Sequence, residues 1–321
     1  MIKAAIVHAF ERPPQYGEIA APVAQTQEVL VRVKAAALSQ LVRAQASGKH
    51  YSSGKVTPMV PGADGVGLLE DGTRVYFAFP RGPVGAMAET VAVKADQCVA
   101  LPDSVDDVTA AAIANPGMSS WAALQERAHF KAGESVLING AAGVSGRLAI
   151  QVARHLGASR IIATARNPSV EAELRDLGAD QFICLGQSSE SLTAAFREAI
   201  QNGGVDVVLD YLWGPPAECF INAAVGYGSG EAAPRIRFVN IGALAGATLA
   251  MTTGPLRSSG LELMGSGLGS ISNADLVKVV GQLLHAIGPA GLKVEACAVP
   301  LDQVEEAWSR TSAERIVFTL A

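Results

Sequence analysis

Hydrophobic and polar positions alternate with a period of two along the first hundred residues. Glu28 to Lys34 reads EVLVRVK, a strict alternation that predicts a strand with one buried face. Similar short runs occur at Ile2–Val7, Gly65–Leu69, Thr73–Phe79 and Glu89–Val93. Proline and glycine turn signals separate these runs. Several short strands at this spacing predict a barrel-like β domain.

The pattern changes near Leu101. Ser104–Ala114 and Ser119–Ala128 have helical composition, and from Ser135 onward buried strands alternate with amphipathic helices. The successive segments are SVLIN, Gly146–Leu156, RIIATA, Ser169–Leu177, QFICL, Ser191–Asn202 and VDVVLD. This alternation predicts βαβ units with a parallel sheet between two layers of helices.

The alternation weakens after RFVNIG, where Thr252–Ser272 is rich in glycine and serine. A helix is expected at Asn273–Ile287, an amphipathic helix at Leu301–Arg310 and a final strand at RIVFTL. The sequence is compatible with two positions for this C-terminal segment. It can belong to the middle domain, or it can return to complete the β domain at the N-terminus.

Composition narrows the class of protein. The chain has 321 residues, 49% of them hydrophobic, and a net charge of −5. This length suffices for two domains with a large core, and the aliphatic content excludes a disordered chain. No Lys/Arg cluster indicates a nucleic-acid partner. Lys3 and His8 interrupt the N-terminus too early for a signal peptide, so we expect a cytoplasmic protein without a membrane anchor.

The four cysteines lie far apart in the sequence, at Cys98, Cys184, Cys219 and Cys297. No Cys-x-x-Cys pair occurs that could hold a metal or form a dithiol couple. We therefore expect reduced thiols and no metal site.

A glycine-rich turn joins the strand SVLIN to the helix that follows it. The turn reads GAAGVSG, from Gly140 to Gly146. Between a strand and a helix, such glycines let the backbone approach a pyrophosphate, which the helix N-terminus attracts. The alternative is a tight turn without a ligand. It is less favoured because the βαβ pattern continues for three more strands.

The next strand bears on the choice of cofactor. NAD-binding units carry an acid about 20 positions after the glycine motif, to bind the ribose hydroxyls. Here Arg166 occupies that place, and no acid follows until Glu171. Because arginine can bind a 2′-phosphate in bidentate fashion, we expect NADPH rather than NADH. The alternative, that Arg166 is a solvated residue at a strand end, stays open.

Several segments together resemble one known family. In order they are EVLVRVKAAALS, VPGADGVG, GAMAE, NPGMSSWAAL, AGESVLINGAAGVSG, LGAD, VDVVLD and LELMGS. The chain is similar to the zinc-free medium-chain dehydrogenase/reductases, namely the quinone oxidoreductases and NADPH-dependent enone reductases. The resemblance implies an α/β fold in which a doubly wound Rossmann sheet is inserted in a GroES-like β-barrel catalytic domain. It places these parts at residues 1–113, 114–255 and 256–321, with residues 114–255 as the Rossmann part, and implies a homodimer.

The glycine motif, Arg166 and the resemblance together define a set of expected cofactor-binding residues. They are Ser119, Gly140, Ala141, Ala142, Gly143, Val144, Ser145, Gly146, Thr164, Ala165, Arg166, Asn167, Asn240, Ile241 and Gly242. The usual Ser and Lys of the family's 2′-phosphate site are replaced by Asn167 and Val170, so Arg166 would supply the charge. Leu185 replaces the tyrosine that the family often places beside the adenine.

The substrate side departs further from the family. Where the family has Leu-Asn-Pro-x-Asp, this chain reads LSQLV from Leu38, and Tyr51 lies near the family's Gly-x-Tyr tyrosine. The resemblance makes Tyr51 and Ser39 the candidate catalytic residues. Zinc-dependent relatives need a cysteine on the early loop and His-Glu after the Pro-Gly. This chain offers Ser39 and Ala63-Asp64 instead, so no zinc is expected.

The expected reaction is hydride transfer from NADPH to a quinone or to the β-carbon of an α,β-unsaturated carbonyl. Hydroxyl donors such as those of Tyr51 and Ser39 would stabilise the developing negative charge. The rival interpretation is an NADPH-binding sensor or regulatory protein with little or no turnover. The altered segment from Ser39 to Ala46 favours that rival.

Overall fold

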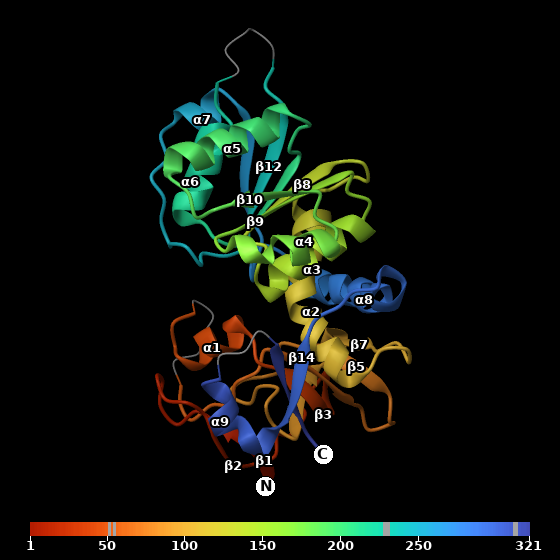
Figure 1. Cartoon of the computed structure of the whole chain (residues 1–321). Coiled ribbons are helices and arrows are strands. Elements are labelled where there is room, and N and C mark those ends of the chain that lie inside the picture. The colour runs from red at the N-terminus through yellow and green to blue at the C-terminus, as the bar shows by residue number, and fades with distance from the viewer. Residues whose placement is uncertain (51–52, 54–55, 227–231, 311–313) are drawn as a thin grey trace. The chain divides into compact units, whose positions relative to one another are not determined.

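The chain forms two compact units in the computed structural model, which describes residues 1–50, 53, 56–226, 232–310 and 314–321. Unit 1 consists of Met1–Asn115 and Ser272–Ala321, and unit 2 of Pro116–Ile271. Figure 1 shows the first residues in red and the last in blue within the same unit. Unit 1 therefore contains both ends of the chain, with unit 2 inserted between them.

Unit 1 is built on a seven-stranded sheet. Its strands are β3 (Glu28–Ala37), β4 (Asp64–Leu68), β5 (Arg74–Ala78), β6 (Thr90–Lys94), β7 (Cys98–Ala100), β14 (Ala296–Pro300) and β15 (Arg315–Thr319). They follow the order β14-β15-β3-β4-β5-β7, with β6 also pairing β3. All pairs are antiparallel except β14 with β15. Because β15 pairs with β3, the C-terminal residues complete the sheet that the N-terminal residues begin.

The remaining elements of unit 1 are a separate hairpin and several helices. They are β1 (Ile2–Ile6) and β2 (Gln15–Ile19), which form a separate hairpin, α1 (Gln40–Ala46), η1 (Ala95–Gln97), α8 (Asn273–Ala290), η4 (Leu301–Gln303) and α9 (Val304–Trp308). The strict alternation in β3 has the expected result, because Val31 and Val33 are fully buried between more exposed neighbours. Aliphatic side chains of β1, β3, β6 and β15 form the core.

A carboxyl group lies inside unit 1. Asp64, the first residue of β4, is only 4% exposed. The Tyr76 hydroxyl donates to its Oδ2 atom at 3.0 Å, and the Asn115 amide approaches Oδ1 at 3.5 Å. Burial raises the pKa of Asp64 to about 6, against the opposing effects of the Arg315 charge and the two hydrogen bonds. Burial likewise raises the pKa of Tyr76 well above its usual value.

The raised pKa of Asp64 predicts that the stability of the protein depends on pH. Its pKa in the folded protein lies above that of a free carboxyl, so its stabilising contribution is complete below about pH 4 and is lost as the pH rises through about 6. We expect Asp64→Asn, which does not titrate, to gain about 2 kcal/mol of unfolding free energy relative to wild type between pH 4 and pH 7. Urea unfolding at each pH measures this difference.

The control for Asp64→Asn is the same substitution at Asp103, whose side chain is exposed rather than buried. A difference between Asp64→Asn and wild type that stays constant with pH would contradict the buried-carboxyl interpretation.

Unit 2 contains a parallel sheet of six strands. They are β8 (Ser135–Asn139), β9 (Arg160–Ala165), β10 (Gln181–Cys184), β11 (Val207–Asp210), β12 (Arg235–Asn240) and β13 (Gly260–Gly265), in the order β10-β9-β8-β11-β12-β13. Its helices are α3 (Val144–His155), η3 (Pro168–Val170), α4 (Glu171–Asp176), α5 (Ser189–Gln201), α6 (Gly214–Ala223) and α7 (Gly254–Arg257). The strand order reverses between β8 and β11. In open α/β sheets, ligands bind beyond the carboxyl ends of the strands at such a reversal.

The helices of unit 2 lie on both faces of the sheet (Figure 1). Right-handed crossovers place α3 and α4 on one face and α5 and α6 on the other, because the chain moves across the sheet in opposite directions. The face covered by α5 and α6 holds an aromatic cluster, in which the Phe220 ring centroid lies 5.4 Å from that of Phe196 and 5.7 Å from that of Phe238. The expected fold class, a doubly wound parallel sheet with a separate β domain, is confirmed.

Several elements differ from the sequence-based expectation, and two of them bear on where the units begin and end. The two helices expected on either side of Asn115-Pro116 form one helix, α2 (Asp107–Ala122), which continues as the π-helical turn η2 (Ala123–Arg127). Buried residues flank Pro116 on both sides, so packing outweighs the helix-breaking tendency of the proline. Strand β13 lies in the Gly/Ser-rich stretch and pairs with β12, which assigns residues 256–271 to unit 2, whereas the sequence placed a boundary at 256.

Candidate functional site

The glycine-rich turn lies at the strand-order reversal, between the end of β8 and the start of α3. Gly140 has φ +94°, a conformation that favours glycine. Gly146 is buried, and a Cβ atom there would lie 2.5 Å from the Ala141 Cα atom. A Cβ atom on exposed Gly143 would meet nothing within 4 Å. The backbone conformation therefore favours glycine at position 140, and packing requires glycine at position 146. Gly143 leaves the backbone accessible to a ligand.

The helix after this turn begins earlier than expected. Gly143 is the N-cap residue and α3 starts at Val144, so Val144, Ser145 and Gly146 form its first turn. The first N–H groups of a helix have no acceptor within the helix, and the helix dipole adds partial positive charge. This end of α3 can therefore bind an anionic group.

Four polar side chains lie in register across four neighbouring strands of unit 2, and we call them the strand-end ladder. They are Thr164 of β9, Asn139 of β8, Asp210 of β11 and Asn240 of β12. The Thr164 hydroxyl donates to Asn139 Oδ1 at 2.9 Å, and the Asn139 amide donates to Asp210 Oδ1 at 2.8 Å. The Asn240 amide donates to Asp210 Oδ2 at 3.0 Å. The ladder thus links the ends of four strands on both sides of the reversal.

The strand-end ladder also holds the glycine-rich turn. The N–H of Gly140 donates to the Thr164 hydroxyl at 3.0 Å, and the N–H of Ala141 donates to the Thr164 carbonyl at 2.8 Å. The turn is therefore fixed by side chains as well as by its own glycines. Thr164 is fully buried, and its hydroxyl is engaged by the turn and by Asn139, while its expected role at the cofactor stays a prediction.

Asp210 is a buried carboxylate surrounded by donors. In addition to the two ladder amides, it accepts the N–H of Trp213 at 3.0 Å and that of Leu212 at 3.2 Å. Burial raises the pKa of Asp210, while these hydrogen bonds oppose the rise by stabilising the charged form. Trp213 has φ +56°, a strained backbone conformation for a large side chain. Its N–H bond to Asp210 helps to hold the turn after β11.

The turn after β12 is held by the main chain of the same residue, Asp210. The N–H of Ile241 donates to the Asp210 carbonyl at 2.7 Å, and the Asn240 amide donates to the Gly242 carbonyl at 2.8 Å. A Cβ atom on Gly242 would lie 2.7 Å from the Tyr211 carbonyl oxygen. Asn240, Ile241 and Gly242 are therefore held against the end of β11.

Ser119 contacts a buried tyrosine that the sequence did not single out. The Ser119 hydroxyl donates to the Pro116 carbonyl at 2.7 Å and lies 3.2 Å from the Tyr211 hydroxyl. Since the single hydrogen of Ser119 is used on Pro116, Tyr211 donates in this second bond. Burial raises the pKa of Tyr211 to about 12, so its hydroxyl stays a donor near neutral pH.

Arg166 lies in the turn after β9. Ala165 is buried, whereas Arg166 and Asn167 are exposed. Asn167 accepts the N–H of Ser169 at 3.0 Å and so begins η3. No hydrogen bond or ion pair engages the Arg166 guanidinium among the residues that the structure describes. Its charge can therefore bind an anionic ligand.

The two candidate catalytic residues belong to unit 1. Ser39 is buried and acts as the N-cap of α1, where its hydroxyl accepts the N–H of Val42 at 3.0 Å. This use leaves its hydrogen for donation to another group. Tyr51 lies outside the described residues. Catalytic roles for Ser39 and Tyr51 stay predictions.

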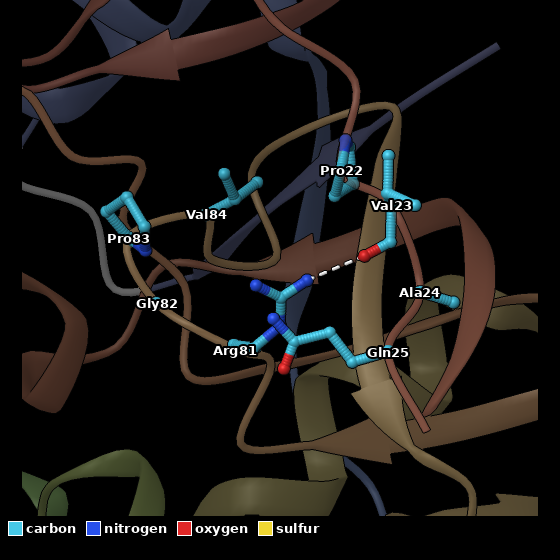
Figure 2. Close-up of a pocket in the computed structure, with 8 residues that line it drawn as sticks. All are labelled: Pro22, Val23, Ala24, Gln25, Arg81, Gly82, Pro83 and Val84. Carbon is cyan, nitrogen blue, oxygen red and sulfur yellow. Dashed lines mark hydrogen bonds between the residues drawn. The ribbon is translucent and has the colours of Figure 1, made fainter. Parts of the chain in front are cut away.

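A surface pocket in unit 1 contains none of the residues that the sequence predicted. Its cavity of about 370 Å³ is lined by Pro22, Val23, Ala24, Gln25, Arg81, Gly82, Pro83 and Val84. Figure 2 shows the Arg81 guanidinium directed at the Val23 carbonyl, to which it donates at 2.7 Å. Arg81 also pairs with Glu28 at 2.8 Å. The Arg81 guanidinium that lines this pocket is therefore already paired with groups of the protein itself.

No group of three or more His, Cys, Asp or Glu side chains that could hold a metal occurs within the described ranges. Nor does any helix there have the length and apolar character needed to cross a membrane.

Sequence reasoning missed Asn139, Asp210 and Tyr211. The available signal was a polar residue that ends an otherwise apolar strand, as in SVLIN and VVLD. Only the register shows that these polar ends adjoin one another, because β8 and β11 are separated in the sequence by β9 and β10.

Comparison with known proteins agrees with this architecture. Residues 145–284 match the family model described as zinc-binding dehydrogenase. A probable NADPH-dependent quinone reductase of Emericella nidulans is 29% identical over 98% of this chain and 99% of its own length. The chloroplastic NADPH-dependent alkenal/one oxidoreductase of Arabidopsis thaliana is 34% identical, over 50% of this chain and 46% of its own. The quinone oxidoreductase structure from Thermus thermophilus is 28% identical, with a TM-score of 0.79 over 99% of this chain and 100% of its own.

The fold and the site define a two-unit α/β protein with a Rossmann-like sheet of the dehydrogenase type. Over nearly its whole length the chain is similar to a quinone reductase, and residues 145–284 match the zinc-binding dehydrogenase model.

The glycine-rich turn gives a test of the site's construction. Because a Cβ atom on Gly146 would lie 2.5 Å from backbone, we expect Gly146→Ala to lower the unfolding free energy by about 2 to 3 kcal/mol. Gly143→Ala is the matched control, since its Cβ atom meets no neighbour and only the N-cap preference changes, at a cost of about 1 kcal/mol. Denaturant unfolding of both variants measures this, and equal losses would contradict the assigned packing.

Proposed function

We propose that this protein is an NADPH-dependent oxidoreductase that reduces a quinone or an α,β-unsaturated carbonyl without zinc. The observation that carries the proposal is the ladder-held glycine turn at the strand-order reversal, with an exposed arginine where NAD-binding units place an acid. The named reductases among the relatives support the same activity.

The residues of unit 2 fit the two charged parts of NADPH. The first turn of α3, with open backbone at Gly143, suits the pyrophosphate. The Arg166 guanidinium suits the 2′-phosphate, which a carboxylate at this place would repel. When bound, NADPH supplies a hydride. Asn240, Ile241, Gly242 and Ser119 are proposed to bind its ribose and nicotinamide end.

The chain must also stabilise the negative charge that develops on the acceptor oxygen. Preorganised hydroxyl donors suit this task and contribute roughly 3 kcal/mol each. We assign this stabilisation of the acceptor oxygen to the hydroxyls of Ser39 and Tyr51. The hydrogen of Ser39 is available because its oxygen serves as the cap of α1.

A homodimer in the cytoplasm belongs to the same proposal. The four cysteines are free thiols, the form that a reducing compartment maintains.

The rival function is NADPH binding without turnover. The named relatives described above are enzymes, which favours turnover. The two functions differ in one measurement. We expect the purified protein to oxidise NADPH when it is given 1,2-naphthoquinone, 9,10-phenanthrenequinone or a small enone. Tight NADPH binding with no turnover on this panel would favour the rival, and no NADPH binding would overturn both.

The choice of cofactor depends on Arg166. Loss of a charge-assisted contact to the 2′-phosphate costs about 1.5 to 3 kcal/mol, so we expect Arg166→Ala to raise the Kd for NADPH by about 10- to 100-fold. The Kd for NADH, which lacks this phosphate, should change less than about twofold. Fluorescence titration with both dinucleotides measures the two constants.

Arg197→Ala is the control for Arg166→Ala, because Arg197 is exposed on α5, on the opposite face of the sheet. An unchanged NADPH affinity in Arg166→Ala, or a native preference for NADH, would contradict the assignment. Arg166→Asp restores the acid of NAD-binding units and should reverse the preference.

A further inference from the structure

A cysteine thiol bridges the ends of two strands beside Arg166. Cys184 is the last residue of β10, and in the parallel register it lies opposite Ala165, the last residue of β9. The N–H of Leu185 donates to the Ala165 carbonyl at 2.8 Å. Beyond this bond, the Cys184 thiol donates to the Arg166 carbonyl with a sulfur–oxygen distance of 3.5 Å. The thiol therefore continues the contact between the two strands past their last paired residues.

The thiol is itself held in place by the loop that follows β10. The N–H of Gly186 donates to the Cys184 sulfur at 3.4 Å, and the Gln187 amide donates to the Cys184 carbonyl at 2.8 Å. A Cβ atom on Gly186 would lie 3.1 Å from the Arg166 carbonyl oxygen and 3.6 Å from the sulfur. The loop thus packs closely against the Arg166 backbone on the side of the thiol.

The thiol contacts the main chain of Arg166, not its side chain. The Arg166 side chain has no hydrogen bond or ion pair with the described residues, so the position of the main chain determines where it begins. A displacement of the main chain at Arg166 would carry the Cα–Cβ bond with it, and the long side chain would enlarge that displacement at the guanidinium.

We propose that Cys184 is a positioning residue for the 2′-phosphate of the dinucleotide, acting through the backbone of Arg166. The inference rests on the proposed function, because it concerns the same NADPH site. Cys184 is not proposed to touch the cofactor, and no chemistry of the thiol is involved. Its part is a hydrogen-bonded bridge, with sulfur as donor to Arg166 and acceptor from Gly186.

The expected effect is small but selective. Thiol hydrogen bonds are weak, and the net value of one hydrogen bond corresponds to an affinity change of about three- to tenfold. We therefore expect Cys184→Ala to raise the Kd for NADPH about three- to tenfold and to change that for NADH less than about twofold. Cys184→Ser, whose hydroxyl both donates and accepts, should stay within about twofold of wild type for both dinucleotides. Fluorescence titration with NADPH and NADH measures these values.

Cys219→Ala is the matched control for Cys184→Ala. Cys219 is a second thiol of unit 2 that donates to a main-chain carbonyl, that of Ser189 at 3.7 Å, far from Arg166 in the sequence. It should leave the ratio of the two dissociation constants unchanged. In an Arg166→Ala background, Cys184→Ala should have no further effect on the NADPH affinity, because the positioned side chain is absent.

The outcomes separate this inference from the proposed function. If wild type prefers NADPH and Arg166→Ala removes the preference, but Cys184→Ala has no effect, the positioning role of Cys184 is wrong and the proposed function stands. An equal loss of NADPH and NADH affinity in Cys184→Ala, or failure of Cys184→Ser to restore binding, also overturns the inference. If wild type does not bind NADPH, the proposed function itself fails.

Discussion

The buried carboxylate of Asp210 is the group on which the candidate site depends. It accepts hydrogen bonds from Asn139 on one side, from Asn240 on the other, and from the N–H groups that follow it. A buried charge is tolerated only when such donors surround it, since an unpaired one is costly. Because β8 and β11 meet where the strand order reverses, this one carboxylate links the turns on which a ligand would be bound.

The buried carboxyl of unit 1 has fewer donors. Asp64 has the Tyr76 hydroxyl at 3.0 Å, a longer contact with Asn115, and the nearby charge of Arg315. Burial raises the pKa of both carboxyls, and for Asp64 it brings the pKa to about 6. The two groups differ in what they do. Asp210 organises turns around a charge, whereas Asp64 is a buried titrating group beside Tyr76, Asn115 and Arg315.

The absence of zinc stays a prediction that rests on the resemblance. Residues 145–284 match the zinc-binding dehydrogenase model, and the resemblance puts Ser39 and Ala63-Asp64 where zinc-dependent relatives carry ligands. Hydrogen-bond donors would then do the work that a Lewis acid does in those relatives. This explains why hydroxyls and their partners, rather than clustered thiols or imidazoles, are the groups to examine in this chain.

The sequence by itself determined the elements that depend on local pattern. The alternation in β3, the parallel sheet, the glycine-rich turn and the position of Arg166 all follow from periodicity and spacing. It did not show that Asn139 and Asp210 form one hydrogen-bonded unit, or that Cys184 contacts Arg166. Those contacts depend on which strands are neighbours and in which register, and non-local packing decides both. The same reason applies to β13, whose place in the sheet is set by its parallel pairing with β12.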